Sequence, residues 1–353
     1  MVRGLVVLVG LLVAAETSAQ DIERLFYYTD NEDSWESLAA NIERVSIIAP
    51  GGYSVDGEGI VWGEVDPRVI RLGREQNVPV MPLIVNPGFN QEMLSRLLND
   101  PEARARATAS MVELCRRHGH YGMQFDFENV AMPDRDALTR FYRETADAFH
   151  REGLRISIAV VHRPDELAGP TRYHAWLFRN WRAGYDVAAL AEIGDFISVM
   201  TYSQHTRRTP PGPQAGIPWV EEVVAWFLER MPANKLSLGI PTGSQHWYTS
   251  QEDRIQPEMA LSYSENIPWK RAMALVERNG AELIWSDEQK VPYAFYNRGG
   301  TFEWVFLENA QSFGAKLELV RKHGLRGFSV WVFGAEDPAI WDALPSRRTR
   351  DAS

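Results

Sequence analysis

Short apolar runs alternate with longer amphipathic stretches along most of this sequence, and this order leaves few possible folds. The amphipathic stretches have the apolar period of surface helices and cover residues 90–118, 134–152, 219–230 and 306–323. Glycines follow three of these helical stretches, as a left-handed helix cap requires. Eight apolar runs have the length and composition of buried strands: residues 25–29, 45–50, 78–85, 121–127, 154–161, 196–202, 235–240 and 327–333.

This order of elements predicts an α/β fold in which helices cover a parallel sheet. Eight strands suggest closure into a (β/α)8 TIM barrel with its active site at the carboxyl ends of the strands, and an open doubly wound sheet is the alternative. The segment 242–304, after the seventh strand, is too long for a connection, so we predict a small α+β insertion that walls a cleft.

The first residues have the pattern of an export signal. Arg3 precedes an apolar run over residues 4–15, and the small residues Thr17 and Ala19 suit cleavage after position 19. The run is too short to span a bilayer, although an uncleaved anchor or a misassigned start would read similarly. We therefore predict a signal peptide over 1–19, an exported periplasmic or extracellular barrel over 20–345, and a solvated tail over 346–353.

Composition excludes several functions. The chain has 37 Lys and Arg against 47 Asp and Glu, and a net charge of −10 argues against a nucleic-acid partner. Its one cysteine, Cys115, lies in an apolar helical pattern and is interpreted as a buried structural thiol. Because the histidines are scattered and no phosphate-binding glycine motif occurs, we expect no metal, nucleotide or other cofactor. We also expect a monomer.

The chemistry is concentrated in the fourth strand. Gln124, Asp126 and Glu128 alternate with Phe125 and Phe127, so the three polar side chains share one face. The Cα atoms of Asp126 and Glu128 should lie roughly 6–7 Å apart, near enough for each charge to raise the pKa of the other. A solvated acidic edge strand is the alternative, but the phenylalanines favour burial. A carboxyl kept protonated near neutrality is suited to act as a general acid.

A second catalytic carboxylate is missing from the other strand ends. Hydrolysis of a glycoside by the ordinary route requires one, but neither residues 200–205 nor residues 238–242 contain Asp or Glu. If Glu128 is a glycosidic acid, the nucleophile could belong to the substrate, as the 2-acetamido group of an N-acetylhexosamine.

Several motifs follow one another along the chain, over residues 125–130, 200–202, 238–241 and 331–337, and residues 27–29, 81–86 and 211–213 extend the pattern. Together and in this order they resemble glycoside hydrolase family 18, and within it the branch of spore-cortex-lytic N-acetylglucosaminidases. The resemblance implies that Glu128 protonates the leaving oxygen and that Asp126 holds the acetamide N–H. It further implies that Tyr202 hydrogen-bonds the acetamide carbonyl and that Trp331 forms the floor under the reacting sugar.

Two positions depart from the family pattern. Gln124 replaces an acid of typical chitinases, and its amide can hydrogen-bond Asp126 without adding a charge. This replacement should affect the pH profile more than the type of reaction. Ser203 stands where the family usually has Asp, so one polar contact to the acetamide or to Glu128 is either missing, which would reduce activity, or supplied by Gln204 or His205.

Other aromatic and amide side chains are candidate sugar contacts. Tyr27 and Tyr28, at the end of the first strand, could line the sugar site or pack in the core. Asn129 and Asn86 could border the cleft, although a capping role would suit them equally.

We therefore expect a retaining glycoside hydrolase that cleaves β-linked N-acetylglucosamine glycans, such as peptidoglycan or its fragments. A chitinase acting on chito-oligosaccharides is the alternative within the enzyme class. A sugar-binding, lectin-like barrel without turnover is the alternative outside it. Glu128 argues against the lectin, and Ser203 argues weakly for it.

Overall fold

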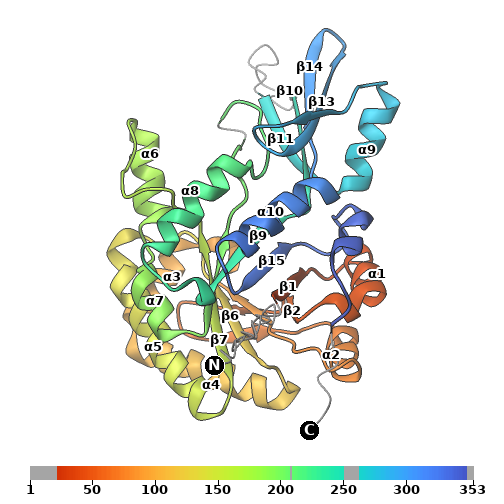
Figure 1. Cartoon of the computed structure of the whole chain (residues 1–353). Helices are drawn as coiled ribbons and strands as arrows, with labels where there is room; N and C mark the ends of the chain where they lie inside the picture. Colours follow the sequence, from red (N-terminus) through yellow and green to blue (C-terminus); the bar gives the residue numbers. More distant parts are fainter. Residues whose placement is uncertain (1–21, 207–208, 250–261, 348–353) are drawn as a thin grey trace, which may run out of the picture.

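A computed structural model of the chain describes residues 22–206, 209–249 and 262–347. Its main sheet curls into a barrel of parallel strands with helices outside it (Figure 1). Around the ring the strands follow in the order β2, β1, β15, β9, β8, β7, β6 and β5. Their bounds are β1 Glu23–Tyr28, β2 Ile47–Pro50, β5 Leu83–Val85, β6 Gly122–Asp126, β7 Arg155–Val161, β8 Phe196–Met200, β9 Leu236–Pro241 and β15 Gly327–Trp331.

The barrel closes between β2 and the chain that leads into β5. Ile48 and Val80 form a parallel bridge there. The Ile48 amide donates to the Pro79 carbonyl over 3.0 Å, and the Met81 amide donates to the Ile48 carbonyl over 2.8 Å. A short hairpin, β3 (Tyr53–Val55) and β4 (Val61–Gly63), pairs beside β5. Each of the eight strands overlaps its predicted run, although most are shorter, so the barrel is confirmed and the open sheet is not formed.

The four predicted helical stretches form helices with one correction, and the described residues outside the insertion add four α-helices that were not predicted. The stretch 90–118 is two helices, α3 (Gln91–Asn99) and α4 (Pro101–His118), because Pro101 cannot donate to a preceding turn and Asp100 caps the new helix through the Glu102 amide over 2.9 Å. The other bounds are α1 Glu32–Asn41, α2 Pro67–Glu75, α5 Arg135–Arg151, α6 Arg172–Leu177, α7 Val187–Ile193, α8 Ile217–Leu228 and α10 Ala310–Lys322.

The insertion after β9 is a separate antiparallel sheet with one helix against it. Its strands lie in the order β11, β10, β14, β13 and β12, and Figure 1 shows it standing at one end of the barrel. The elements are β10 Ser244–Thr249, β11 Ser262–Ile267, α9 Trp269–Arg278, β12 Ile284–Ser286, β13 Val291–Arg298 and β14 Thr301–Phe306. The predicted α+β insertion is therefore present.

Close packing explains two features of the barrel. Gly122 begins β6 where the chain almost touches its neighbour, since a Cβ there would lie 1.8 Å from the Arg155 carbonyl oxygen. The predicted buried thiol is confirmed, because Cys115 is fully buried on α4 and burial raises its pKa to about 12. Among the described helices, we find none with the length and apolar character of a membrane span.

The predicted signal peptide over 1–19 lies outside the described residues. The predicted tail is only partly described, and its first part differs from the expectation. The Arg347 amide donates to the Glu43 carbonyl over 2.8 Å, and its guanidinium donates to the carbonyls of Gln76 and Asn77. Arg347 is thus held against the barrel, because these carbonyls accept its hydrogen bonds.

Candidate active site

A pocket of about 220 Å³ opens at the carboxyl ends of the barrel strands. Strands far apart in the sequence contribute to it, because parallel strands all end at the same rim of a barrel. The insertion contributes one side chain, Asn266 of β11. The remaining lining residues are Tyr27, Phe89, Asp126, Glu128, Ala159, Met200, Tyr202, Ser203, Gln214, Pro241 and Trp331.

Asp126 and Glu128 both line this pocket, as their alternation along the strand predicts. Asp126 is 8% exposed, and its Oδ1 has no hydrogen-bond partner among the described residues. Burial, and to a smaller extent the charge of Glu128, raise the pKa of Asp126 to about 7. Burial also raises the pKa of Glu128, against a hydrogen bond from Trp181 that lowers it. The pair therefore retains a proton near neutral pH.

Trp181 is a neighbour of Glu128 that sequence analysis missed. Its indole Nε1–H donates to Glu128 Oε2 over 3.2 Å. An indole nitrogen can only donate, so Oε2 accepts and the acidic proton of Glu128 belongs on the other carboxyl oxygen. Trp181 lies in a π-helical turn, Phe178–Arg182, and its ring meets His162 edge to face at 5.3 Å. No motif marks it, since only the fold brings it across 53 positions to Glu128.

The main chain at Glu128 is held by an amide side chain rather than by a strand ladder. Asn86 Oδ1 accepts from the Glu128 amide and Asn86 Nδ2 donates to the Glu128 carbonyl, both over 3.1 Å. The next residue, Asn129, has φ 57° and donates through Nδ2 to the Phe89 carbonyl over 2.9 Å. Asn86 and Asn129 thus fix the turn that carries Glu128, and neither side chain lines the pocket.

Gln124 lies beneath the pocket and is fully buried. Its Oε1 accepts from the Tyr27 hydroxyl over 2.7 Å, and its Nε2 donates to Ser157 over 2.9 Å and to Ser198 over 3.1 Å. A neutral amide thus occupies the barrel interior with its hydrogen bonds made inside the protein. The structure shows no hydrogen bond between Gln124 and Asp126, so the contact expected from the sequence is not formed among the described residues.

Tyr27 and Trp331 form an aromatic side of the pocket. Their ring centroids lie 5.3 Å apart at 57°. Trp331 is held at the end of β15 by Thr242, whose hydroxyl donates to the Trp331 and Val332 carbonyls over 3.0 and 2.9 Å. An apolar ring fixed at the pocket wall is suited to packing against a sugar face.

Tyr202 lines the pocket, and burial raises its pKa well above the usual value. Ser203 beside it has φ 59°, and its amide donates to Gln214 Oε1 over 3.2 Å. Gln204 does not reach the pocket, because its Oε1 accepts from the Gly216 amide over 2.7 Å. His205 contacts the Pro210 carbonyl over 3.1 Å and is also absent from the lining.

Tyr28 does not reach the pocket either. It alternates with Tyr27 along β1 and so points into the layer between sheet and helices, where its hydroxyl donates to Asp66 over 2.7 Å. Thus the structure brings together Tyr27, Asp126, Glu128, Tyr202 and Trp331. It leaves Gln124, Asn129, Gln204 and Tyr28 outside the lining.

A barrel with one buried and one half-buried carboxyl side by side, and with fixed aromatic rings at the carboxyl ends of its strands, has the architecture of the barrel glycosidases. The chain matches Glycosyl hydrolases family 18 over residues 65–336. It therefore belongs to this family of glycosidases.

Relatives with similar sequences agree with this assignment. The cortical fragment-lytic enzyme of Bacillus subtilis (strain 168) is 31% identical over 274 residues, which are 76% of this chain and 60% of that protein. The alignment thus spans well under two thirds of that relative. The uncharacterized glycosylase YvbX of the same strain is 22% identical over 324 residues, 90% of this chain and 89% of that protein.

Two solved structures share the fold. The chitinase from Chromobacterium violaceum ATCC 12472 superposes with a TM-score of 0.80 at 25% identity, covering 91% of this chain and 97% of that chain. The Bacillus cereus spore cortex-lytic enzyme SleL has a TM-score of 0.79 at 21% identity, covering 91% of this chain and 73% of that one.

Proposed function

We propose that this chain hydrolyses β-linked N-acetylglucosamine glycans with retention of configuration, using the substrate's own 2-acetamido group as nucleophile. One observation carries the proposal. Among the described residues that line the pocket, Asp126 and Glu128 are the only acids, and they lie together at the end of β6 and in the turn that follows it. No carboxylate of the described lining therefore faces them across the pocket as a separate nucleophile would.

Four residues of the pocket have separate roles in the proposed reaction. Protonated Glu128 gives its proton to the leaving glycosidic oxygen, and Asp126 accepts the acetamide N–H so that the carbonyl oxygen bonds to C1. Tyr202 donates its hydroxyl to that carbonyl, and Trp331 supports the sugar ring. The glycosidic bond breaks as an oxazolinium intermediate forms. Glu128, now a carboxylate, takes a proton from the water that opens the intermediate on the original face.

The proposed substrate is peptidoglycan or its fragments. The B. subtilis relative that is 31% identical is a cortical fragment-lytic enzyme, which supports this choice. A chitinase acting on chito-oligosaccharides is the second candidate, favoured by the C. violaceum chitinase that this chain resembles over 97% of that structure. Product analysis on both substrates side by side separates the two candidates.

We also propose that the chain acts after export and as a monomer. The support for export is the basic, apolar and small-residue pattern of residues 1–19. Amino-terminal sequencing of the protein made by its own host should begin at Gln20, and a start within the first residues would contradict the proposal.

We predict that Glu128→Gln abolishes turnover of peptidoglycan fragments and of an aryl N-acetylglucosaminide while binding persists. The change removes the proton donor and little volume, so kcat should fall by about 10² to 10⁴. Glu92→Gln, an exposed acid on α3, is the matched control and should keep full activity.

Two outcomes would contradict the proposal. Wild-type binding without turnover of either substrate would identify a lectin. Equal cleavage of the glucoside that lacks the 2-acetamido group would show that the substrate does not supply the nucleophile.

A further inference from the structure

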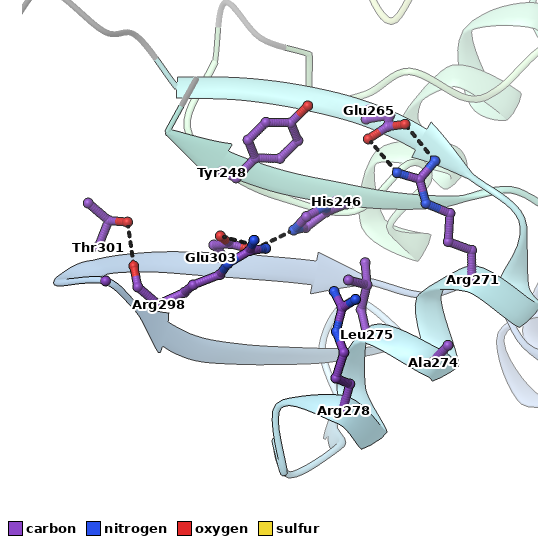
Figure 2. A pocket seen from close by; sticks show the side chains of 11 residues that line it. His246, Tyr248, Glu265, Arg271, Ala274, Leu275, Arg278, Arg298, Thr301 and Glu303 are labelled. Carbon is purple, nitrogen blue, oxygen red and sulfur yellow. Dashed lines mark hydrogen bonds and ion pairs between the residues drawn. The ribbon is translucent and has the colours of Figure 1, made fainter. Parts of the chain in front are cut away.

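A second cavity, of about 750 Å³, lies in the insertion between its antiparallel sheet and α9 (Figure 2). Its volume is in the range of sites for small molecules. Its lining is charged, and comprises His246, Tyr248, Glu265, Arg271, Ala274, Leu275, Arg278, Arg298, Gly299, Thr301 and Glu303.

The cavity is separated from the catalytic pocket by the thickness of the sheet. His246 of β10 pairs with Glu265 of β11 and, on its other side, lies opposite Val305 of β14, whereas Gln245 pairs with Asn266. Since side chains alternate along a strand, His246 and Asn266 point to opposite faces. Asn266 lines the catalytic pocket and His246 lines the second cavity. The second cavity is therefore an independent site.

Buried polar groups form the wall of this cavity. Glu303 is 7% exposed, and its Oε2 accepts from His246 Nε2 and from the Tyr296 hydroxyl, each over 2.9 Å. Burial lowers the pKa of His246, although Glu303 opposes the shift. Hydrogen bonds from within the protein thus already stabilise the carboxylate of Glu303, and a ligand would not have to neutralise its charge.

Three guanidinium groups surround the same space. Figure 2 shows Arg271, Arg278 and Arg298 turned toward it. Arg271 is committed to Glu265 by two hydrogen bonds of 2.7 and 3.2 Å. Arg298 reaches Glu303 only as an ion pair of 3.8 Å, and Arg278 makes no ion pair or side-chain hydrogen bond with another described residue. The lining thus holds three positive charges against two negative ones. The guanidinium groups of Arg278 and Arg298 keep N–H donors available for a ligand.

We propose that this cavity binds an anionic ligand through a carboxylate or phosphate group, held by Arg278 and Arg298. Guanidinium groups match the geometry of both anions with paired N–H donors. Leu275 and Ala274 offer apolar contact to the body of such a ligand. Binding here is separate from glycan hydrolysis and does not require it.

The test is titration calorimetry of the full chain with inorganic phosphate and, separately, with glutarate. We expect saturable binding of at least one anion with a stoichiometry of one. Arg278→Gln should weaken it by about tenfold, since one charge-assisted contact is lost. Arg321→Gln removes another exposed arginine from the last turn of a helix, α10, and should leave the affinity unchanged.

The two probes distinguish a phosphate from a carboxylate ligand. Because Arg278 is exposed, both variants should keep the unfolding temperature of the wild type, and Glu128→Gln should keep the anion affinity. Absence of saturable binding to either probe overturns the proposal, as does equal weakening by Arg278→Gln and Arg321→Gln.

Discussion

Trp181 sets the state of the acid Glu128 through one hydrogen bond. The indole N–H stabilises the carboxylate form and so lowers the pKa of Glu128 against the effect of burial. Because Oε2 accepts this hydrogen bond, the proton of the acid belongs on the other carboxyl oxygen, which makes no side-chain hydrogen bond with another described residue. Trp181 is therefore a positioning residue for the proposed acid.

We predict that Trp181→Phe moves the alkaline limb of the kcat/KM pH profile upward by about one pH unit. Loss of a hydrogen bond to a charged group destabilises the carboxylate by about 1.5 kcal/mol. This energy corresponds to a rise of about one unit in the pKa of Glu128. Trp219→Phe is the matched control, because its ring also meets His162, at 4.8 Å, without a hydrogen bond to Glu128. An unmoved limb in Trp181→Phe would show that the indole does not set this pKa.

The buried carboxyl of Asp126 lowers the stability of the folded chain when it is ionised, so its effect depends on pH. Its pKa of about 7 in the folded chain exceeds the ordinary value, so between about pH 4 and pH 7 the native state binds more protons than the unfolded state. The fold therefore loses stability as the pH rises through this window. Retention of such a group at a buried position is typical of a functional site.

We predict that Asp126→Asn gains stability relative to the wild type as the pH rises from 4 to 8. The upper bound of the gain is about 4 kcal/mol, from a pKa shift of about three units. Denaturant unfolding at several pH values measures it, with Asp33→Asn on the exposed face of α1 as control. A difference that stays constant with pH would contradict this account.

At the scale of single elements, local signals placed helix ends well. Gly119, Gly153 and Gly324 have φ of 69°, 73° and 58°, as their positions after helical stretches predicted. The break at Pro101 was missed because the apolar period continues through it, although proline and a preceding Asp are a sufficient signal for a new helix. Periodicity alone therefore merged two helices that cap chemistry separates.

One buried ion pair fixes α10 to the chain leaving the insertion. Lys316 is fully buried, and its Nζ donates to Glu308 Oε2 over 2.7 Å. Ser312 donates to the same oxygen over 2.8 Å. Because Glu308 is itself buried, it depends on these partners for its charge.

We predict that Lys316→Met destabilises the protein by about 3–5 kcal/mol, because it leaves a buried carboxylate unpaired. Lys322→Met removes an exposed lysine from the same helix, where its pair with Glu221 is solvated, and should cost less than about 1 kcal/mol. Chemical denaturation compares the two variants. Equal effects would mean that the buried pair contributes no more than the exposed one.

At the scale of the whole molecule, the insertion presents two different faces. Asn266 on one face of its sheet lines the catalytic pocket. The opposite face lines the charged cavity, which has three arginines. A chain with a net charge of −10 thus concentrates positive charge at one place. Overall charge, which the sequence provides directly, could not reveal this cluster. Arg271 and Arg278 share one face of α9, but only the folding of the insertion brings Arg298 of β13 to them.

The barrel and the shared face of Asp126 and Glu128 could be predicted from the order of residues alone. Both depend on periods of two to four residues, which the chain carries locally. The folded chain was needed to show that Trp181 and Asn86 hold Glu128, that Tyr28 and Gln204 lie away from the pocket, and that a second cavity exists. These contacts join residues that are often tens of positions apart, and no local period specifies how distant segments meet when the barrel closes and the insertion packs.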